Sequence, residues 1–439
     1  MEHSTTANGV TELNTTEHST TPTPTPTPTT ATDKRLITGN QKLDWVDAHM
    51  PVLKAIEDRF KEEQPFKGLK IAVCIHLEAK TAHLCEVLQA GGAQVFLAGS
   101  NPLSTQDDVA AAIAARGVKV FAKYGCTTEE YLQFIREMIE EEPHIILDDG
   151  GDVVQMVHDE FPHLIPHIIG GCEETTTGVL RMKAREAEGQ LKFPMISVND
   201  AMSKYLFDNR YGTGQSVWTG IMQTTNLIIA GKTVVVAGYG WCGKGVAHKA
   251  QALGANVIVT EIDAIKAIEA VMDGFTVMPM TEACPLGDIF VTVTGCCDVI
   301  TTEHFPLLKN GAILTNAGHF NVEVEYEALE AHADSKRTVR QNIMAYTLPN
   351  GKEVYLIAEG RLVNLASGDG HPAEIMDTSF AVQALCAEYL TQHQLNPGVY
   401  DVPEHLDRQV AQLKLETLGV AIDTLTPKQA NYLKQFTHA

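Results

Sequence analysis

A β-branched run that breaks into four glycines constrains this chain more than any other stretch. Residues 232–245 read KTVVVAGYGWCGKG, in which Val234 to Val236 predict a buried parallel strand that leads into a glycine turn and then a helix. Such a turn needs Gly238 for the tight bend, Gly240 where a pyrophosphate approaches the backbone, and Gly243 where the helix packs closely on the sheet. The helix N-terminus would then offer free N–H groups to phosphate oxygens.

A carboxylate follows this unit at the distance that a nucleotide-binding fold requires. The apolar run 256–260 ends at Glu261, eighteen residues after Gly243. In dinucleotide-binding folds, an acidic residue about 20 residues beyond the turn binds the ribose 2′-hydroxyl. A structural glycine turn is the alternative, but strand, turn, helix, strand and acid together favour a nicotinamide dinucleotide. Glu261 favours NAD over NADP, because a 2′-phosphate would meet a like charge.

Composition disfavours several classes of protein. The 439 residues carry a net charge of −22 with a pI near 5.1, which argues against nucleic-acid and anionic-membrane partners. No apolar run has the length of a membrane span. We therefore expect a soluble, cytoplasmic protein of two to three domains that binds neither membranes nor nucleic acids. Nine scattered cysteines without metal-ligand spacing predict reduced thiols, no disulfide framework and no bound metal.

Alternating strands and helices divide the chain into two α/β units. The predicted strands are 68–75, 93–97, 118–121, 144–147 and the apolar stretch 164–169 in the first unit, and 234–236, 256–260, 275–278, 289–294 and 312–315 in the second. Such alternation is typical of doubly wound, Rossmann-like parallel sheets with helices on both faces. A helix over 374–393 would return the chain to the first unit. Two amphipathic segments follow, at 406–418 and 427–434.

These patterns predict two Rossmann-like domains joined by a hinge, with a small helical segment at the C-terminal end. Residues 1–36 are rich in Thr and Pro and lack a basic start with an apolar block, so they predict a disordered tail and not a secretory signal. The predicted domains are 43–199 with 371–398 for substrate binding, 200–370 for the dinucleotide, and 399–439 for oligomerisation.

Polar clusters follow three predicted strands of the first domain, at 76–81, 148–152 and 173–177. Ligands of open α/β sheets bind beyond the carboxyl ends of the strands. A helix cap or solvated turn would explain any one cluster, but three together favour a pocket. Lys204 and Asp208 also lie one helical turn apart; a solvated surface pair and a partly buried lysine explain that spacing equally well.

Several short motifs together resemble the S-adenosyl-L-homocysteine hydrolase family. The resemblance spans roughly residues 43–433, in order. Besides the glycine turn, it rests on HLE at 76–78, LDDGGD at 147–152, EETTTG at 173–178, ND at 199–200, Lys204 with FDN at 207–209, NAGHF at 316–320, EGRLVN at 359–364 and GHP at 370–372.

The resemblance implies hydrolysis of S-adenosyl-L-homocysteine to homocysteine and adenosine, with tightly bound NAD as cofactor. Oxidation of the ribose 3′-hydroxyl makes the 4′-hydrogen acidic, elimination expels the thiol, water adds, and the ketone is reduced back, so NAD is regenerated in each turnover. The resemblance also implies a homotetramer and a place in the methyl cycle of one-carbon metabolism. Closure of the two domains would keep water from the ketone.

Residue roles follow from the matched motifs. The implied catalytic residues are Lys204 with Asp208 as base at the 3′-hydroxyl, Glu174 at the ribose, Asp149 and His76 for the 4′-proton and the leaving thiol, and His319 and Asn199 in support. The implied cofactor contacts are Thr175, Thr176, Thr177, Asn209, Glu261, Asn316 and Asn364, beside the three glycines. Thr81 and His371 are implied at the substrate. A lysine base that works near neutral pH needs a lowered pKa, which burial would provide.

The purine end departs from the family pattern. Many relatives have a threonine and a glutamate where this chain has Glu78 and Lys80, and a methionine where it has Asp369. Adenine presents an amine there, and lysine is also only a donor, whereas hypoxanthine presents a carbonyl oxygen. One hypothesis is therefore a preference for S-inosyl-L-homocysteine. The alternative is that Lys80 pairs with Glu78 or Asp369 and that backbone groups recognise adenine.

Two other classes of function fit parts of the sequence. A catalytically silent, nucleotide-binding regulator would have lost Lys204, Asp208, Asp149 or His76, and all four are present. An ordinary NAD dehydrogenase would accumulate reduced cofactor as it consumed its substrate. The hydrolase would instead release homocysteine without added NAD.

Overall fold

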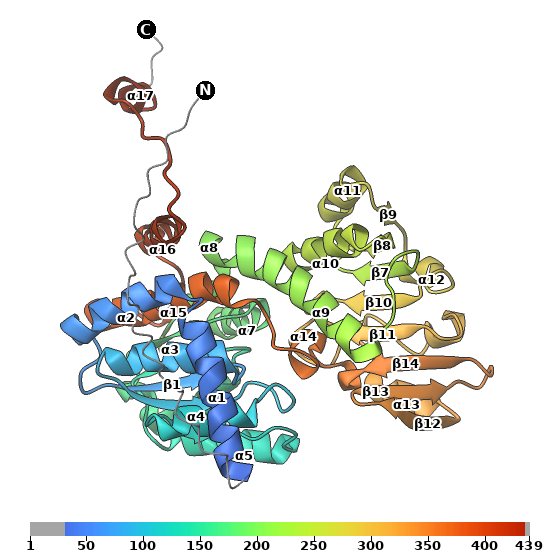
Figure 1. Ribbon diagram of the computed structural model, residues 1–439, viewed down its shortest axis with the longest axis horizontal. Coiled ribbons are helices and arrows are strands. Elements are labelled where there is room, and N and C mark those ends of the chain that lie inside the picture. The colour runs from blue at the N-terminus through green and yellow to red at the C-terminus, as the bar shows by residue number, and fades with distance from the viewer. Residues whose placement is uncertain (1–30, 435–439) are drawn as a thin grey trace, which may run out of the picture.

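The computed structural model describes residues 31–434, with side chains from residue 34 onward. Most of the predicted 1–36 tail therefore lies outside the described residues. The first described element is α1 (Ala31–Asp47), so regular structure begins before the boundary that we predicted at residue 43. Figure 1 shows two α/β domains side by side, with a C-terminal segment that projects away from the first.

The first domain is built on a seven-stranded parallel sheet with the order β15-β6-β5-β4-β1-β2-β3. Its strands are β1 (Lys70–Cys74), β2 (Gln94–Ala98), β3 (Lys119–Phe121), β4 (Ile145–Asp148), β5 (Gly170–Glu173), β6 (Pro194–Ser197) and β15 (Gly398–Asp401). Its helices are α1, α2 (Pro51–Glu63), α3 (Ala79–Ala90), α4 (Asp107–Ala115), α5 (Thr128–Ile139), α6 (Asp152–Glu160), η1 (Pro162–His167), α7 (Thr176–Ala187), η2 (Val198–Asp200), α15 (Ala373–Gln392) and α16 (Glu404–Thr417).

Helices bury both faces of this sheet. Ile71 and Val73 of β1 enter one core, and Ala72 and Cys74 enter the other. The predicted doubly wound architecture is therefore confirmed. Strand order reverses between β1 and β4, which places the ends of these two neighbours at the switch point where α/β sheets bind ligands.

Two details of the first domain differ from the prediction. The stretch 164–169 is not a strand: residues 162–167 form the short helix η1, whose two prolines cannot donate to a sheet, and β5 follows over 170–173. The strand β15 covers 398–401 and pairs with β6. The predicted boundary between 398 and 399 therefore falls inside a strand of the first domain.

The second domain contains an eight-stranded sheet with the order β12-β13-β14-β11-β10-β7-β8-β9. Its strands are β7 (Thr233–Ala237), β8 (Asn256–Thr260), β9 (Thr276–Val277), β10 (Ile289–Thr292), β11 (Ile313–Asn316), β12 (Ser335–Arg340), β13 (Ile343–Thr347) and β14 (Glu353–Ile357). Its helices are α10 (Trp241–Ala252), α11 (Ala264–Met272), α12 (Met280–Ala283), η4 (Phe305–Leu307), α13 (Tyr326–His332), η5 (Ala358–Gly360) and α14 (Val363–Ala366). The hairpin β12–β13 is antiparallel and was not foreseen, because β12 carries charged, exposed residues and offers no apolar run, although β13 is largely buried.

A long helical run connects the domains (Figure 1). It consists of α8 (Met202–Lys204), the π-helical η3 (Tyr205–Gly212) and α9 (Thr213–Thr225). Helix α15 then returns the chain to the first domain, as predicted, and α17 (Pro427–Tyr432) lies beyond α16. Between residues 31 and 434, no helix combines the length and the apolar character that a membrane span requires.

Candidate active site

The glycine turn between β7 and α10 has the geometry that the sequence predicted. Gly238 has a left-handed φ of +101°, which favours glycine. A Cβ atom added at Gly243 would lie 2.0 Å from the carbonyl oxygen of Gly238, so a larger residue would push the helix off the turn. A Cβ added at Gly240 would meet no atom within 4 Å, and Gly240 directly precedes α10. Open space and free helix N–H groups therefore coincide there.

Two polar side chains of this domain also fit a dinucleotide. The carboxylate of Glu261 accepts hydrogen bonds from the backbone N–H groups of Tyr239 and Ile262, both at 2.7 Å, and so fixes the turn. Asn364 is buried and donates to Ser216 Oγ at 3.1 Å, while its Oδ1 has no hydrogen-bond partner in the described residues. A buried oxygen without a donor costs free energy unless a ligand supplies one. The residues present therefore fit NAD.

Further predicted cofactor residues lie at the start of α7 and at the end of β11, where they have structural roles of their own. Thr175 caps α7, with Thr176 and Thr177 as the first residues of the helix, where N–H groups are free. Asn316 donates to the carbonyl oxygens of Gly318 (3.0 Å), Phe320 (2.9 Å) and Gly360 (2.8 Å), so its amide holds the 316–320 loop. Contact of these residues with NAD stays a prediction.

Lys204 is buried among carboxylates and amides. Its ammonium group donates to Asn209 Oδ1 at 2.8 Å and lies 3.5 Å from Glu174 Oε1 and 3.6 Å from Asp208 Oδ2. Asn209 donates in turn to Asn199 Oδ1 at 3.1 Å. The Lys204–Asp208 spacing therefore belongs to a buried pair and not to a solvated one. It lies where α8 changes into the π-helical η3, a feature that is frequent at functional sites.

The pKa of Lys204 is raised, so our expectation of a lowered pKa was wrong. Burial alone lowers the pKa of Lys204, but the carboxylates of Asp208 and Glu174 outweigh burial. Burial raises the pKa of Glu174 to about 7, although Lys204 opposes that shift. The pKa of Asp208 is lowered, because Lys204 and His371 outweigh the effect of its burial.

Asp208 connects Lys204 to the hinge. Its Oδ1 lies 2.8 Å from His371 Nδ1, and its Oδ2 accepts a hydrogen bond from Ser379 Oγ of α15 at 2.7 Å. His371 Nε2 lies 3.3 Å from Thr213 Oγ1 at the start of α9. Both segments that cross between the domains therefore converge on this carboxylate.

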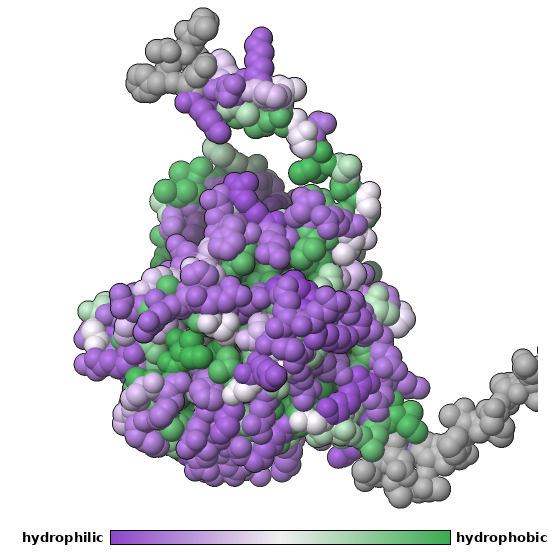
Figure 2. All heavy atoms as spheres, turned by 90° about the vertical axis from the view of Figure 1, so that its left-hand side faces the viewer, coloured by the Kyte–Doolittle hydropathy of each residue, from purple (hydrophilic) through white to green (hydrophobic). Residues whose placement is uncertain are grey.

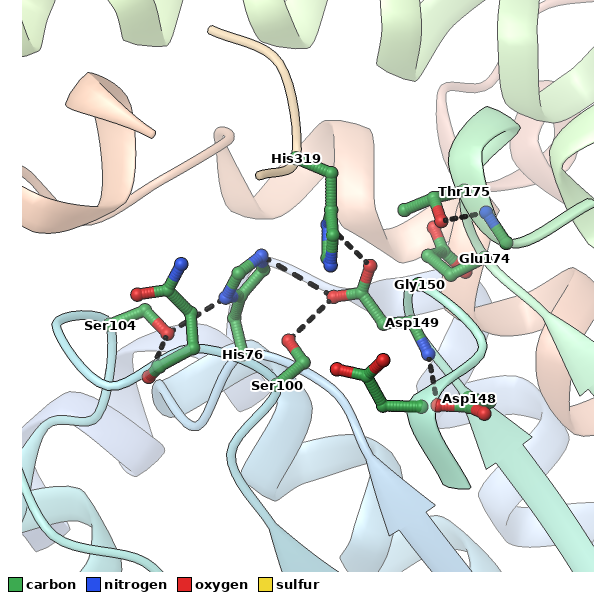
Figure 3. Close-up of polar contacts among 12 residues, drawn as sticks. His76, Ser100, Ser104, Asp148, Asp149, Gly150, Glu174, Thr175 and His319 are labelled. Carbon is green, nitrogen blue, oxygen red and sulfur yellow. Dashed lines mark hydrogen bonds and ion pairs between the residues drawn. The ribbon is translucent and has the colours of Figure 1, made fainter. Parts of the chain in front are cut away.

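His76, Asp149 and His319 form a second group (Figure 3). Asp149 Oδ2 lies 3.4 Å from His76 Nε2 and accepts from Ser100 Oγ at 2.9 Å, and its Oδ1 lies 3.5 Å from His319 Nδ1. His76 and Asp149 follow β1 and β4, whereas His319 comes from the second domain, so the domains meet here. The three ligand atoms lie within 4.8 Å of one another, a spacing that would also suit a divalent cation and that our sequence analysis did not foresee.

Hydrogen bonds fix the protonation of His76. Ser104 Oγ donates to the carbonyl oxygen of Asn101 at 3.1 Å, so it accepts from His76 Nδ1 at 2.7 Å. The nitrogen without a proton is therefore Nε2, which faces Asp149. Burial lowers the pKa of His76 to about 4, so the ring is neutral. Burial raises the pKa of Asp149, but interactions with the two imidazoles, Ser100 and Lys204 together outweigh burial, so this pKa is also lowered. Nε2 and the Asp149 carboxylate are therefore both unprotonated, and the lone pair on Nε2 faces a carboxylate oxygen of Asp149 at 3.4 Å.

The predicted purine residues are in contact with one another. Lys80 and Glu78 form a buried ion pair, and Lys80 Nζ also donates to the carbonyl oxygen of Asp369 at 2.8 Å. Glu78 caps α3 by accepting from the backbone N–H of Lys80 at 3.1 Å. Thr81 Oγ1 donates to the carbonyl oxygen of His76 at 2.6 Å and so holds the loop that carries this histidine.

The lysine and histidine groups belong to one site. Asp148 and Glu173 are partners in the β4–β5 pair, and Asp149 and Glu174 follow them directly. Glu174 N–H also donates to the carbonyl oxygen of Asp148 at 3.0 Å. The clusters predicted after three separate strands are therefore brought together at one edge of the first sheet.

Sequence reasoning missed several supporting side chains. Gln383 of α15 donates to Glu174 Oε2 at 2.6 Å. Ser100 and Ser104 also escaped notice. Signals were present: the serines follow the predicted strand at 93–97, and Gln383 lies one helical turn after Ser379 in a helix of mostly apolar residues.

Fold and site together define a two-domain α/β enzyme with a Rossmann-type NAD domain and an interdomain acid–base centre. The family model described as S-adenosyl-L-homocysteine hydrolase matches residues 33–163, and the model of the NAD-binding domain of that family matches residues 209–370.

Curated relatives match over most of the chain. An S-inosyl-L-homocysteine hydrolase of Methanosarcina mazei is 58% identical over 92% of this chain and 98% of its own, and an adenosylhomocysteinase of Thermococcus kodakarensis is 55% identical over 91% and 96%. Among solved structures, a transhydrogenase of Sinorhizobium meliloti matches over 73% of this chain and 95% of its own, with 12% identity and a TM-score of 0.39. The chain belongs to the S-adenosyl-L-homocysteine hydrolase family.

Proposed function

We propose that this protein catalyses the reversible hydrolysis of a purine-nucleoside thioether of L-homocysteine to homocysteine and the nucleoside. One observation carries the proposal: a buried lysine with two carboxylates and a His-Asp-His group lie at the ends of neighbouring strands. When bound, NAD would supply a reversible hydride acceptor for the ribose 3′-hydroxyl. The protein then has to handle two protons, one on that hydroxyl and one on the neighbouring carbon.

Lys204 and Glu174 suit the hydroxyl proton. Because the pKa of Lys204 is raised, its ammonium group stabilises negative charge that develops on the 3′-oxygen. Glu174, with a pKa of about 7, changes its protonation near neutral pH and so accepts and returns the proton. Lys204 and Glu174 therefore act together, and Lys204 need not be the base itself.

His76 and Asp149 suit the proton on carbon. The free electron pair on His76 Nε2 faces the carboxylate of Asp149 at 3.4 Å, so the two groups together take up the 4′-proton and return a proton to the leaving thiolate. His319 contributes from the other domain only when the cleft is closed. Closure therefore completes the site and excludes water from it.

We further infer that the preferred purine is hypoxanthine, in S-inosyl-L-homocysteine. Lys80 gives one N–H to Glu78 and one to Asp369 in the described part of the chain, and an ammonium group has three. The remaining donor matches the 6-carbonyl oxygen of hypoxanthine and not the amine of adenine. The carboxylate of Glu78 already accepts hydrogen bonds from Lys80 Nζ and from the backbone N–H groups of Lys80 and Thr81, so it has less acceptor capacity left for that amine. Relatives named S-inosyl-L-homocysteine hydrolase and relatives named adenosylhomocysteinase have similar sequence identity to this chain, so identity does not distinguish the two substrates. The inference therefore rests on Lys80.

Thiol release from the two thioethers tests both proposals on the NAD-loaded protein. We expect a higher kcat/KM with the inosyl substrate, and Lys80→Glu should shift the preference towards the adenosyl substrate by roughly tenfold or more, since a mismatched buried hydrogen bond costs about 1–3 kcal/mol. The exposed Lys119→Glu is the control. Release with a clear adenosyl preference would refute the purine inference alone. No release from either substrate would refute the hydrolase.

We also propose that the protein is a homo-oligomer of the cytoplasm. Helix α17 has no buried residue, and Leu418, Ile422 and Leu425 are each at least 60% exposed. Hydrophobic residues are visible on the projecting segment in Figure 2. Apolar surface of this kind marks contact sites. The nine cysteines are all free, as expected for a reducing compartment.

A further inference from the structure

Two neighbouring cysteines, Cys296 and Cys297, lie exposed in the loop that follows β10. The other seven cysteines are buried or half-buried. We propose that this pair is a vicinal dithiol site that binds one soft, thiophilic centre, for which a trivalent arsenical is the simplest ligand. Thiol and thiolate sulfurs are the ligands that soft centres prefer. The proposal concerns a binding site apart from the acid–base centre and does not depend on the substrate.

Hydrogen bonds hold both ends of the loop that carries the two cysteines. Glu323, which is buried, accepts hydrogen bonds from Thr294 N–H (2.9 Å), Thr294 Oγ1 (2.7 Å) and Gly295 N–H (2.8 Å). At the far end, Asp298 has a left-handed φ of +54° and donates from its N–H to the carbonyl oxygen of Val322 at 2.9 Å. A preorganised loop loses less conformational entropy when it binds.

The geometry favours a bridging atom over a direct disulfide. Cys296 and Cys297 are adjacent in the chain, and both are exposed. Consecutive Cα atoms are about 3.8 Å apart, whereas disulfides usually join Cα atoms about 4.4–6.8 Å apart. A disulfide between neighbours is therefore strained. An atom that bridges the two sulfurs forms a ring with one more member than a disulfide would, and so relieves this strain.

The chemistry balances without a redox partner. An arsenoxide, R–As=O, forms two As–S bonds as two S–H bonds and the As=O bond break, and both thiol protons leave with the oxygen as one water. Arsenic stays trivalent and no electrons are transferred. The Asp298 carboxylate, with the neighbouring thiol, raises the pKa of Cys297, so this sulfur carries its proton at neutral pH.

The site lies beside the nucleotide turn and faces the other domain. A Cβ added at Gly238 would lie 3.0 Å from the carbonyl oxygen of Val293 and 3.2 Å from Thr294 Cγ2, so the start of the loop packs against the glycine turn. A Cβ added at Gly295 would lie 3.9 Å from Thr177 Oγ1 of the first domain. An adduct on the next two residues would therefore lie at the rim of the interdomain cleft.

Phenylarsine oxide added to the NAD-loaded protein tests the site, with intact mass and peptide mapping as readouts. We expect one phenylarsenic group per chain with loss of one water, mapped to Cys296 and Cys297, removed by a dithiol but not by an equal concentration of a monothiol. Cys297→Ser should weaken binding by roughly 100-fold or more, because the second bond is then no longer intramolecular. The half-buried, single Cys126→Ser is the matched control and should bind as the wild type does.

Several results would overturn the proposal. These are uptake that Cys297→Ser leaves unchanged, an adduct that maps elsewhere, or no uptake at all by protein whose far-UV circular dichroism and NAD content are normal. Mapping also separates the site from Cys172 and Cys386, a buried pair whose thiols interact. Because binding is read by mass, its failure would say nothing about thioether hydrolysis, and failure of hydrolysis would leave this test intact.

Discussion

Glu174 and Asp208 flank the same ammonium group, yet their pKa values move in opposite directions. Asp208 receives hydrogen bonds or ion pairs from Lys204, His371 and Ser379, which favour its charged form. Glu174 accepts one hydrogen bond, from Gln383, and its Oε1 has no hydrogen-bond partner in the described residues. Burial therefore dominates for Glu174 alone. Two neighbouring carboxyls with separated pKa values are typical of acid–base sites, with Glu174 as the group that changes protonation.

This difference predicts how stability depends on pH. The folded pKa of Glu174, about 7, exceeds its ordinary value of 4.5, so the folded protein binds more protons than the unfolded chain between those pH values. Stability from this group is present below pH 4.5 and is lost as pH rises towards 7. The variant Glu174→Gln cannot ionise at this position, so it does not lose this stability as the pH rises. The stability of the variant relative to the wild type should therefore increase from pH 4.5 to 7, by at most about 3 kcal/mol.

Thermal midpoints across that pH range measure the effect. The exposed Glu282→Gln is the control and should give a curve parallel to the wild type. Parallel curves for Glu174→Gln as well would show that Glu174 is already ionised at pH 5.

Sequence spacing showed that Lys204 and Asp208 could meet, because residues four apart share a helix face. It could not give the direction of the lysine pKa. That direction depends on Glu174, which lies thirty residues earlier and reaches Lys204 only through the β5 strand end. The sequence motifs predicted which residues form the site. The direction of the Lys204 pKa shift depends on burial and on the distances to neighbouring charges, and these require the three-dimensional positions of the residues.

At the level of elements, the loop after β4 controls how closely the domains approach. Gly150 has a φ of +110°, and its N–H donates to the buried Glu173 at 2.9 Å. A Cβ added there would lie 2.3 Å from His319 Nε2 of the other domain. Glycine is therefore needed both for the backbone conformation and for the approach of His319 to Asp149.

Gly150→Ala should disable catalysis without unfolding the protein. We expect kcat for thiol release to fall roughly 100-fold, because displacement of a catalytic group by about 1 Å has that effect. Gly189→Ala separates strain from contact: Gly189 has a φ of +68°, but a Cβ added there would meet nothing within 4 Å. That control should lose some stability and keep its kcat. Equal losses of kcat in both variants would show that backbone strain, and not the His319 contact, is responsible.

The sequence predicted well those elements in which one local stretch of residues shows both the burial of the element and its function. The β7 strand is a β-branched run because both its faces are buried, and the glycines that follow it have separate steric roles. The strand β5 was misplaced because Gly170 and Gly171 offer no apolar signal. Both need glycine: a Cβ there would lie 2.9 Å from Leu390 Cδ2 and 2.7 Å from Met195 Sδ, respectively. Tertiary packing, which the local sequence does not show, decides such positions.

At the scale of the whole molecule, apolar surface is distributed unevenly. Helix α11 exposes Ile265, Ile268 and Met272 at 77%, 55% and 82%, and the segment from Leu418 to Leu425 is also exposed. The segment projects from the first domain in Figure 1, so it adds little to the core of its own chain. Exposed apolar residues on a projecting arm reduce solubility unless another surface covers them, and a second copy of the chain is the occupant that we propose.

Assembly should therefore depend on this arm. Ile422 and Leu425 are 66% and 60% exposed, and replacing both by Lys introduces charges that cannot be buried between copies without a large desolvation cost. We expect light scattering after gel filtration to show a lower molar mass for the double variant than for the wild type. Leu180→Lys, at a position 58% exposed on α7, is the matched control and should keep the mass of the wild type. A wild-type protein that is already monomeric would refute the oligomer, whereas an unchanged mass in the double variant would show that copies meet through another surface.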